Sequence, residues 1–420
     1  MACLMRKETI FFCLSLCVFC SQSPTHAQAI ASFTVPDINN AIATPVYVDI
    51  DQLTSAADSS LVLRDMNEGR NIPFQVEHGY HRFLWWLVKK EPSRKTTTRI
   101  FELSMDKRPR HADPVIKVME ENGALLITAN KKKVLQYNYE VQYPPKGVDT
   151  FFKRSGFIHP LWSPSGNVLT QINPPDHYHH MGIWNPWTDV VYQGKKVDFW
   201  NLGDKKGTVR FAHFISKDMG DVFGGFKALQ EHVVLDSPAR ASETIAMNEV
   251  WDIKVFNVGP SIWLWDFTST LNCAATDTVF LKEYRYGGFG FRATADWNSQ
   301  NSRVFTSEGK TRKEADASRA RWCMIDGDMQ KGHSGILFMG APSNYNFPEP
   351  MRVWPEDMNK RGDVFFSFSP TRNTDWTLIP GNSYVLKYRM LVYEDTILPA
   401  QAEEVWKNFA HPPKVIVSKK

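Results

Sequence analysis

Short apolar runs and apolar–polar alternation recur along most of the chain. Pro45–Ile50 carries β-branched residues near period two, and Arg82–Val88 is an almost continuous apolar run. Both patterns are typical of β-strands. Further runs of the same kind are Ala124–Thr128, Val134–Tyr137, Ile262–Phe267, Val364–Phe368 and Tyr384–Met390.

Turn-forming residues separate these runs, as at Asn122-Gly123, Pro164–Gly166 and Pro380–Asn382. Amphipathic helical periodicity is rare, and its best example is Ala400–Phe409, which ends before Pro412. Many short strands with regular turns and no alternating helices favour packed antiparallel sheets. The fold class we predict is therefore all-β.

One segment interrupts the strand pattern. Asp106–Pro114 is charged, contains proline and lacks periodic apolar positions, so we place a domain boundary at residues 105–114. We expect a small β-sandwich domain over residues 30–108, a larger β domain over 114–400, and a C-terminal helix and tail over 401–420.

The first 29 residues have the layout of a signal peptide. Arg6 and Lys7 precede the apolar stretch Ile10–Cys20, and Ala27–Ala29 is an A-x-A cleavage site. We therefore expect an exported protein, periplasmic or extracellular, whose mature chain begins at Ile30.

Cysteine positions refine this expectation. A lipoprotein would need Cys17 or Cys20 directly after the signal-peptide cleavage site. The large residues that precede these cysteines disfavour a lipoprotein. Cys273 and Cys323 would remain after cleavage, either as one disulfide bond or as two buried thiols.

Composition excludes several classes of protein. Lys and Arg number 49 against 45 Asp and Glu, a net charge of +4, which excludes a strongly cationic nucleic-acid binder. No long apolar run follows residue 29, so we expect no membrane span. The oligomeric state is left open.

The densest chemistry lies in Ile172–Trp184, where three histidines and one aspartate occupy five positions. In an extended segment, His177 and His179 would share one face and His180 the other. Two such imidazoles can share a divalent metal, with His177 and His179 as ligands, or one can transfer protons while the other orients it. Asp176 can hold a ring N–H. A loop whose histidines satisfy backbone groups is the remaining alternative.

A second candidate segment is Glu283–Arg292. Strand alternation would put Glu283 and Arg285 on one face, as a structural ion pair or as an acid/base group beside a guanidinium fork. The Gly-Gly that follows Tyr286 permits close approach of a ligand. No G-x-G-x-x-G opens a helix and no Walker pattern occurs, so we expect no nucleotide cofactor.

Tryptophan is abundant, with 14 residues in the chain. Flat aromatic faces suit the apolar C–H faces of sugars, so we expect a carbohydrate partner, although many of these rings belong to the core. The cluster we single out is Trp162, Trp184, Trp187, Trp200, Trp251, Trp263 and Trp265.

Several segments resemble one family of proteins. They are Ser155–Gly166, Pro174–Gly182, Val197–Trp200, Tyr286–Arg292 and Leu386–Val392. In collinear order over residues 114–395, they resemble the secreted bacterial proteins named "methane oxygenase PmoA-like". The resemblance implies a β-supersandwich similar to the galactose-mutarotase-like fold, and a role in glycan degradation. It does not imply a membrane-embedded monooxygenase subunit, because no segment after the signal peptide could span a bilayer.

Together these features predict a carbohydrate-active enzyme that performs glycosidic cleavage, epimerisation or lyase chemistry. The catalytic residues we expect are His177, His179, His180 and Glu283. The substrate-binding residues we expect are Arg285, Tyr286, Arg292, Trp184, His159 and Asp176. A hydrolase would need a second carboxylate, which Asp176, Asp198 or Asp266 could supply. The alternatives are a non-catalytic glycan-binding protein and a metal-dependent oxidative enzyme.

Overall fold

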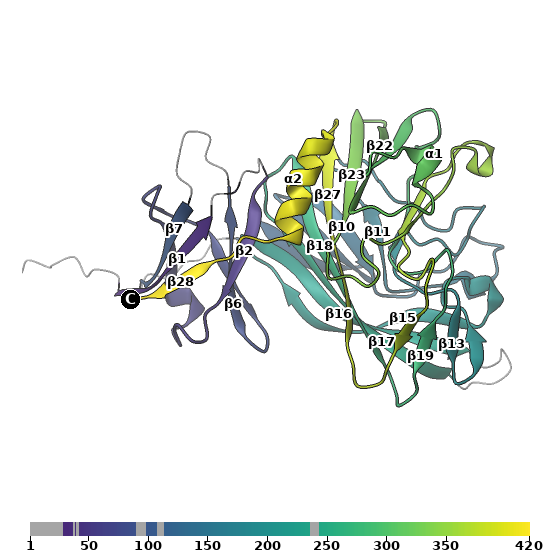
Figure 1. Ribbon diagram of the computed structural model, residues 1–420, viewed down its shortest axis with the longest axis horizontal. Helices are drawn as coiled ribbons and strands as arrows, with labels where there is room; N and C mark the ends of the chain where they lie inside the picture. Colours follow the sequence, from purple (N-terminus) through teal and green to yellow (C-terminus); the bar gives the residue numbers. More distant parts are fainter. Residues whose placement is uncertain (1–27, 37, 39–41, 90–97, 107–112, 236–242) are drawn as a thin grey trace, which may run out of the picture.

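The computed structural model describes residues 28–36, 38, 42–89, 98–106, 113–235 and 243–420. The predicted signal peptide lies outside these residues, except for Gln28 and Ala29, which begin strand β1. The same is true of most of the predicted domain boundary, since residues 107–112 are not described. Figure 1 shows two lobes side by side, with the purple N-terminal strands in the smaller one.

The smaller lobe is a sandwich of two antiparallel sheets. One has the strand order β28(Ile416–Lys419)-β1(Gln28–Pro36)-β7(Thr98–Met105)-β3(Leu61–Asp65)-β4(Arg70–Asn71), and the other β2(Thr44–Asp49)-β6(Arg82–Val88)-β5(Phe74–His78). Phe33 of the first sheet stacks on Trp86 of the second, with ring centroids 5.5 Å apart. Buried residues of both sheets form one core.

The larger lobe contains two eight-stranded antiparallel sheets. Sheet I has the order β24(Met351–Val353)-β25(Phe365–Phe368)-β20(Gly290–Arg292)-β12(Ile183–Trp184)-β11(Phe157–Leu161)-β10(Lys132–Asn138)-β9(Ala124–Ala129)-β8(Ile116–Glu121). Sheet II has the order β15(Gly207–Asp218)-β16(Phe223–Leu235)-β17(Glu243–Phe256)-β18(Ile262–Cys273)-β27(Tyr384–Glu394)-β23(His333–Gly340)-β22(Trp322–Asp328)-β21(Ser302–Thr306). A four-stranded sheet, β14(Lys195–Val197)-β13(Val190–Tyr192)-β19(Val279–Leu281)-β26(Trp376–Leu378), adjoins them.

Side-chain alternation in sheet I separates two apolar regions. Ile183 and Phe366 point into the large core that sheets I and II share. Their chain neighbours Trp184 and Phe365 belong to a different cluster, together with Trp354 and Trp200. Sheet I therefore carries an aromatic layer on the face turned away from the main core, and we call this the outer face of sheet I.

The C-terminal segment contributes to both lobes. Helix α2(Pro399–Ala410) packs against sheet II, where the Trp406 indole N–H donates to the carbonyl of Gly340 over 3.0 Å. The chain then returns to the small lobe, where β28 pairs with β1. Within the described residues, no helix is both long and apolar enough to cross a membrane.

The all-β prediction is confirmed: the regular secondary structure of the described residues is mostly antiparallel strands, with little helix. Strand β6 coincides with the predicted run Arg82–Val88, and α2 contains the predicted helix Ala400–Phe409. The domain limits stay a prediction. Cys273 and Cys323 are both free and buried, which decides between the two cysteine alternatives.

Candidate functional site on the outer face of sheet I

The histidine motif forms a tight loop. An isolated bridge between Ile172 and Met181 closes it, and the Asn173 N–H donates to the His180 carbonyl over 2.9 Å. Two successive turns fill the loop, with His177 N–H bonded to the Pro174 carbonyl and His180 N–H to the His177 carbonyl. The segment is thus folded rather than extended, so the faces expected for an extended strand do not apply.

The turns bring the three imidazole rings together. Ring centroids lie 5.4 Å apart for His177 and His179, 4.7 Å for His177 and His180, and 4.8 Å for His179 and His180. The cluster packs on the outer aromatic layer, since His180 lies 5.1 Å from the Trp184 ring and 5.1 Å from the Phe365 ring.

His180 is the deepest of the three, with 1 % of its surface exposed. Burial, followed by the proximity of His179 and Arg292, holds the pKa of His180 well below its usual range. Its Nδ1 atom has no hydrogen-bond partner among the described residues. His180 is therefore a neutral ring that packs the loop onto the sheet.

His177 and Asp176 form a hydrogen-bonded pair at the surface of the cluster. The distance from His177 Nδ1 to Asp176 Oδ2 is 2.7 Å, and the two side chains are 28 % and 22 % exposed. Asp176 also accepts hydrogen bonds from both terminal guanidinium nitrogens of Arg292, at 2.9 and 3.1 Å. Partial burial opposes ionisation, but the His177 hydrogen bond and the Arg292 charge together hold the pKa of Asp176 well below its usual range. Asp176 is thus a permanent carboxylate that fixes the His177 ring.

Residues of a distant segment complete this network. The Asn359 amide donates to Asp176 over 2.8 Å and to Asp363 over 2.9 Å, and Arg292 donates to Asp363 over 3.3 Å. The Arg292 guanidinium carbon lies 4.7 Å from the centroid of the Trp354 ring. Trp354, Asn359 and Asp363 are not predicted as site residues from the sequence, because neither histidine density nor a glycine pattern marks their segment.

The remaining histidines of the predicted site are uncharged at neutral pH. Burial lowers the pKa of His159 to about 4, and its Nδ1 lies 2.9 Å from the Thr170 hydroxyl. Burial, with the proximity of His177 and Arg154, lowers the pKa of His179 to about 3. These imidazoles can donate or accept hydrogen bonds, but they are not cations in the physiological range.

The second predicted segment reaches the site only in part. It runs from the loop after β19 through β20, and in the loop Tyr286 accepts a hydrogen bond from the Trp354 indole over 3.1 Å. Arg285 is exposed, with its guanidinium carbon 5.4 Å from the Tyr286 ring centroid. Glu283 is also exposed, and its backbone N–H bonds to Asp375 over 2.7 Å. Among the described residues, no hydrogen bond or ion pair joins Glu283 to the histidine loop.

The carboxylates considered as a second catalytic acid have other roles. Asp198 accepts the backbone N–H groups of Trp200 and Asn201, both at 2.8 Å. Asp266 forms a bidentate pair with Arg389 in sheet II. The carboxylate held in the site itself is Asp176, supported by Asp363.

Metal binding by His177 and His179 stays a prediction. Over the part of the chain that the structure describes, one group of three potential ligands has all its donor atoms within 4.8 Å of one another: Asp49, Asp51 and His81. That group belongs to the small lobe. Two histidines alone would leave most of a metal's coordination sphere to other ligands.

The fold and the site define a two-sheet β-sandwich protein with a His–Asp–Arg network on the outer face of one sheet. The chain belongs to the family described as "Family of unknown function (DUF6807)", whose model matches residues 124–407. The comparison with curated proteins found no match.

Two solved structures show distant similarity. An α-mannosidase from Enterococcus faecalis V583 is 8 % identical, with a TM-score of 0.44, and the match covers 94 % of this chain and 47 % of that one. This chain thus spans about half the length of that protein. A protein from Klebsiella pneumoniae subsp. pneumoniae MGH 78578, assigned as an aldose 1-epimerase, is 9 % identical with a TM-score of 0.30, and the match covers 88 % and 95 % of the two chains. At these scores the similarity carries no inference about activity.

Proposed function

We propose that this protein is a carbohydrate-active enzyme in which His177 transfers protons. The observation that carries the proposal is the Asp176–His177 pair, which is partly open to solvent and anchored by Arg292 beside an aromatic layer. A carboxylate bonded to one ring nitrogen fixes the tautomer and leaves the other nitrogen to take or give a proton.

Each neighbour has a role in this proposal. Arg292, buried between Asp176 and Asp363, is a positioning residue that keeps the carboxylate ionised and in place. Tyr286 and His179 are partly exposed beside the pair, where a hydroxyl and a neutral imidazole can bond to sugar hydroxyls. The rings of Trp354 and Trp184 pack against His177 and His180 of the loop and form its apolar support.

The geometry favours proton transfer at a sugar carbon or hydroxyl over two-carboxylate hydrolysis. Both oxygens of Asp176 are occupied by Arg292, and Asp363 is occupied by Arg292 and Asn359. Neither carboxylate is thus free as a nucleophile. Epimerisation or lyase chemistry needs an acid/base pair rather than a nucleophilic carboxylate, with His177 as one member and Glu283 as the predicted second.

The test is a turnover screen on neutral and uronate-containing oligosaccharides, with products followed by NMR and mass spectrometry. His177→Gln should lower the turnover of an active substrate at least about 100-fold, the range for loss of a general acid/base. The matched control is His333→Gln, because His333 also bonds to aspartates, at 2.9 Å from Asp328 and 3.1 Å from Asp326, but far along the chain from the site. The control should retain wild-type turnover.

Two results would contradict the proposal. Wild-type turnover in His177→Gln would remove His177 from the chemistry. Binding of glycans without any turnover by the wild-type protein would make the chain a glycan-binding protein.

We also propose that the protein is exported and that it is related to the PmoA-like proteins. Sequencing the N-terminus of protein recovered outside the cytoplasm checks the first, and the expected first residue is Ile30.

A further inference from the structure

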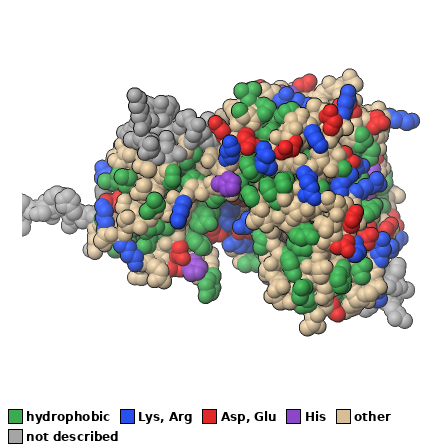
Figure 2. Space-filling view, viewed as in Figure 1, with side chains coloured by type: hydrophobic (Ala, Val, Ile, Leu, Met, Phe, Trp, Pro, Cys, Tyr) green, Lys and Arg blue, Asp and Glu red, His purple; other side chains and the backbone are tan. Residues whose placement is uncertain are grey.

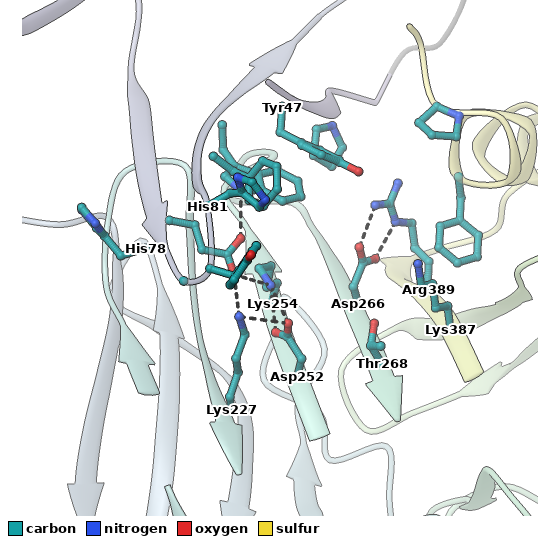
Figure 3. Close-up of a pocket in the computed structure, with 18 of the residues that line it drawn as sticks. Tyr47, His78, His81, Lys227, Asp252, Lys254, Asp266, Thr268, Lys387 and Arg389 are labelled. Atoms are coloured by element: carbon teal, nitrogen blue, oxygen red, sulfur yellow. Dashed lines mark hydrogen bonds and ion pairs between the residues drawn. The ribbon is translucent and has the colours of Figure 1, made fainter. Parts of the chain in front are cut away.

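A cleft of about 410 Å³ lies between the two lobes, away from the histidine site. Figure 2 shows hydrophobic and charged side chains together in the hollow between the lobes. One wall comes from β2, β5 and β6 of the small lobe, the floor from β16, β17, β18 and β27 of sheet II, and the rim from the end of α2 (Figure 3). The volume is within the usual range for small-molecule sites.

The floor carries opposite charges on neighbouring strands. Asp266 on β18 lies between Lys254 on β17 and Arg389 on β27 in the sheet register. Arg389 donates to both oxygens of Asp266, at 2.6 and 2.8 Å, and Lys254 donates to Asp252 over 2.8 Å. A second row follows the order Lys227, Asp252, Thr268 and Lys387 on the same four strands. The paired floor groups thus offer donors and acceptors with little net charge.

The wall is aromatic. The Tyr47 ring lies 4.5 Å from Trp85 and 5.5 Å from Phe83, between ring centroids. Tyr47 is 49 % exposed and Tyr80, at the mouth, is 97 % exposed. An interface built only to join two lobes would bury such rings, since exposed aromatic surface at a cavity is typical of ligand sites.

We propose that this cleft binds a segment of a neutral oligosaccharide. Sugar hydroxyls both donate and accept, which matches a floor of paired carboxylates and cations, and the C–H face of a pyranose matches the Tyr47–Trp85 wall. An anionic ligand would need several cations without partners, whereas three of the four floor cations, Lys227, Lys254 and Arg389, lie against carboxylates, which leaves Lys387 as the floor cation without a carboxylate partner among the described residues. An acyl chain would need an apolar floor. The inference shares the ligand class of the proposed function but none of its residues.

The experiment measures binding of the full chain to an array of neutral oligosaccharides, followed by titration calorimetry with the strongest binder. Tyr47→Ala should weaken binding about ten-fold, the loss of one aromatic stacking contact. The matched control is Tyr143→Ala, because Tyr143 is also exposed but does not line the cleft. Circular dichroism and thermal unfolding verify that the variants are folded.

Each outcome has a definite meaning. Weaker binding in Tyr47→Ala, with an unchanged control and unchanged binding in His177→Gln, supports the cleft site even if no turnover is ever found. Binding lost in His177→Gln but kept in Tyr47→Ala would place the sugar at the histidine site and overturn the inference. Absence of binding to every neutral glycan, or binding of peptides or anions instead, would also overturn it.

Discussion

Glu349 is a carboxyl group enclosed in the large lobe. It is fully buried, accepts the Tyr388 hydroxyl over 2.6 Å and accepts the Asn344 amide over 3.1 Å. Burial raises the pKa of Glu349 to about 7, against the opposing effect of these two hydrogen bonds. No cation pairs with it among the described residues, so its proton is retained across the acidic range.

This environment makes stability depend on pH. From its ordinary pKa of 4.5 up to about 7, the unfolded chain releases the Glu349 proton while the folded protein keeps it, so stability falls as pH rises. Glu349→Gln removes this slope and should gain about 3 kcal/mol relative to wild type between pH 4 and pH 8. Urea unfolding across that range measures it. Glu121→Gln, at an exposed strand end, is the control, and parallel pH profiles for wild type and Glu349→Gln would contradict the assignment.

Single residues of the candidate site differ in how well the sequence marks them. The density of histidines beside Asp176 was enough to indicate the loop, and Arg292 followed from the glycine-rich segment. Asn359 and Asp363 could not be predicted, since their role depends on β24 and β25 bringing a distant loop to Asp176. The orientation of His177 likewise depends on two turns that local pattern alone does not specify.

Among elements, strands with several consecutive apolar residues, such as β6 and the four-residue β25, were predicted, and strands of two or three residues were not. Strand β6 contains enough consecutive apolar residues to be predicted from the sequence alone. Strands β12 and β20 have two and three residues, and they exist only because neighbours in sheet I pair with them. The return of the chain to form β28 was also missed, because its four residues are all exposed and show no buried face.

Strand β28 offers a test at this scale. It pairs with residues Ala31–Thr34 of β1, and it contributes no buried side chain of its own. Ending the chain at Val415, which keeps the Val415 side chain on the small-lobe core, should therefore remove edge hydrogen bonds and lower the stability of the small lobe by about 1–3 kcal/mol. Hydrogen exchange should speed up at β1 amides and stay unchanged at β17 in the large lobe. Equal protection of β1 in both chains would show that the pairing adds nothing.

Across the whole molecule, contacts between sheets of different lobes fix the cleft. Glu77 of β5 accepts the ammonium groups of Lys227 over 2.9 Å and Lys254 over 3.0 Å, both from sheet II. The Trp85 ring lies 5.9 Å from Phe223, which adds an apolar contact. The sequence pattern does not predict these contacts between the lobes, because Glu77, Lys227 and Lys254 each have the pattern of a solvent-exposed residue on their own strand.

The Glu77 contact leads to a final prediction. Burial raises the pKa of Glu77, but Lys254 and Lys227 outweigh it and the net pKa is lowered. The contact therefore stabilises the folded state above pH 4.5, and this contribution is lost as pH falls through the lowered pKa. Glu77→Gln should lower the stability of the small lobe at pH 7 by about 1–3 kcal/mol, with a difference that shrinks in acid.

Calorimetry at pH 7 and pH 3 measures this effect. Glu120→Gln is the matched control, since Glu120 pairs with Lys217 on an exposed surface, where water and salt screen the attraction. A Glu77→Gln variant as stable as the control at pH 7 would mean that apolar packing, including Trp85 on Phe223, holds the lobes together without the ion pairs. The shape of the cleft would then depend on that packing.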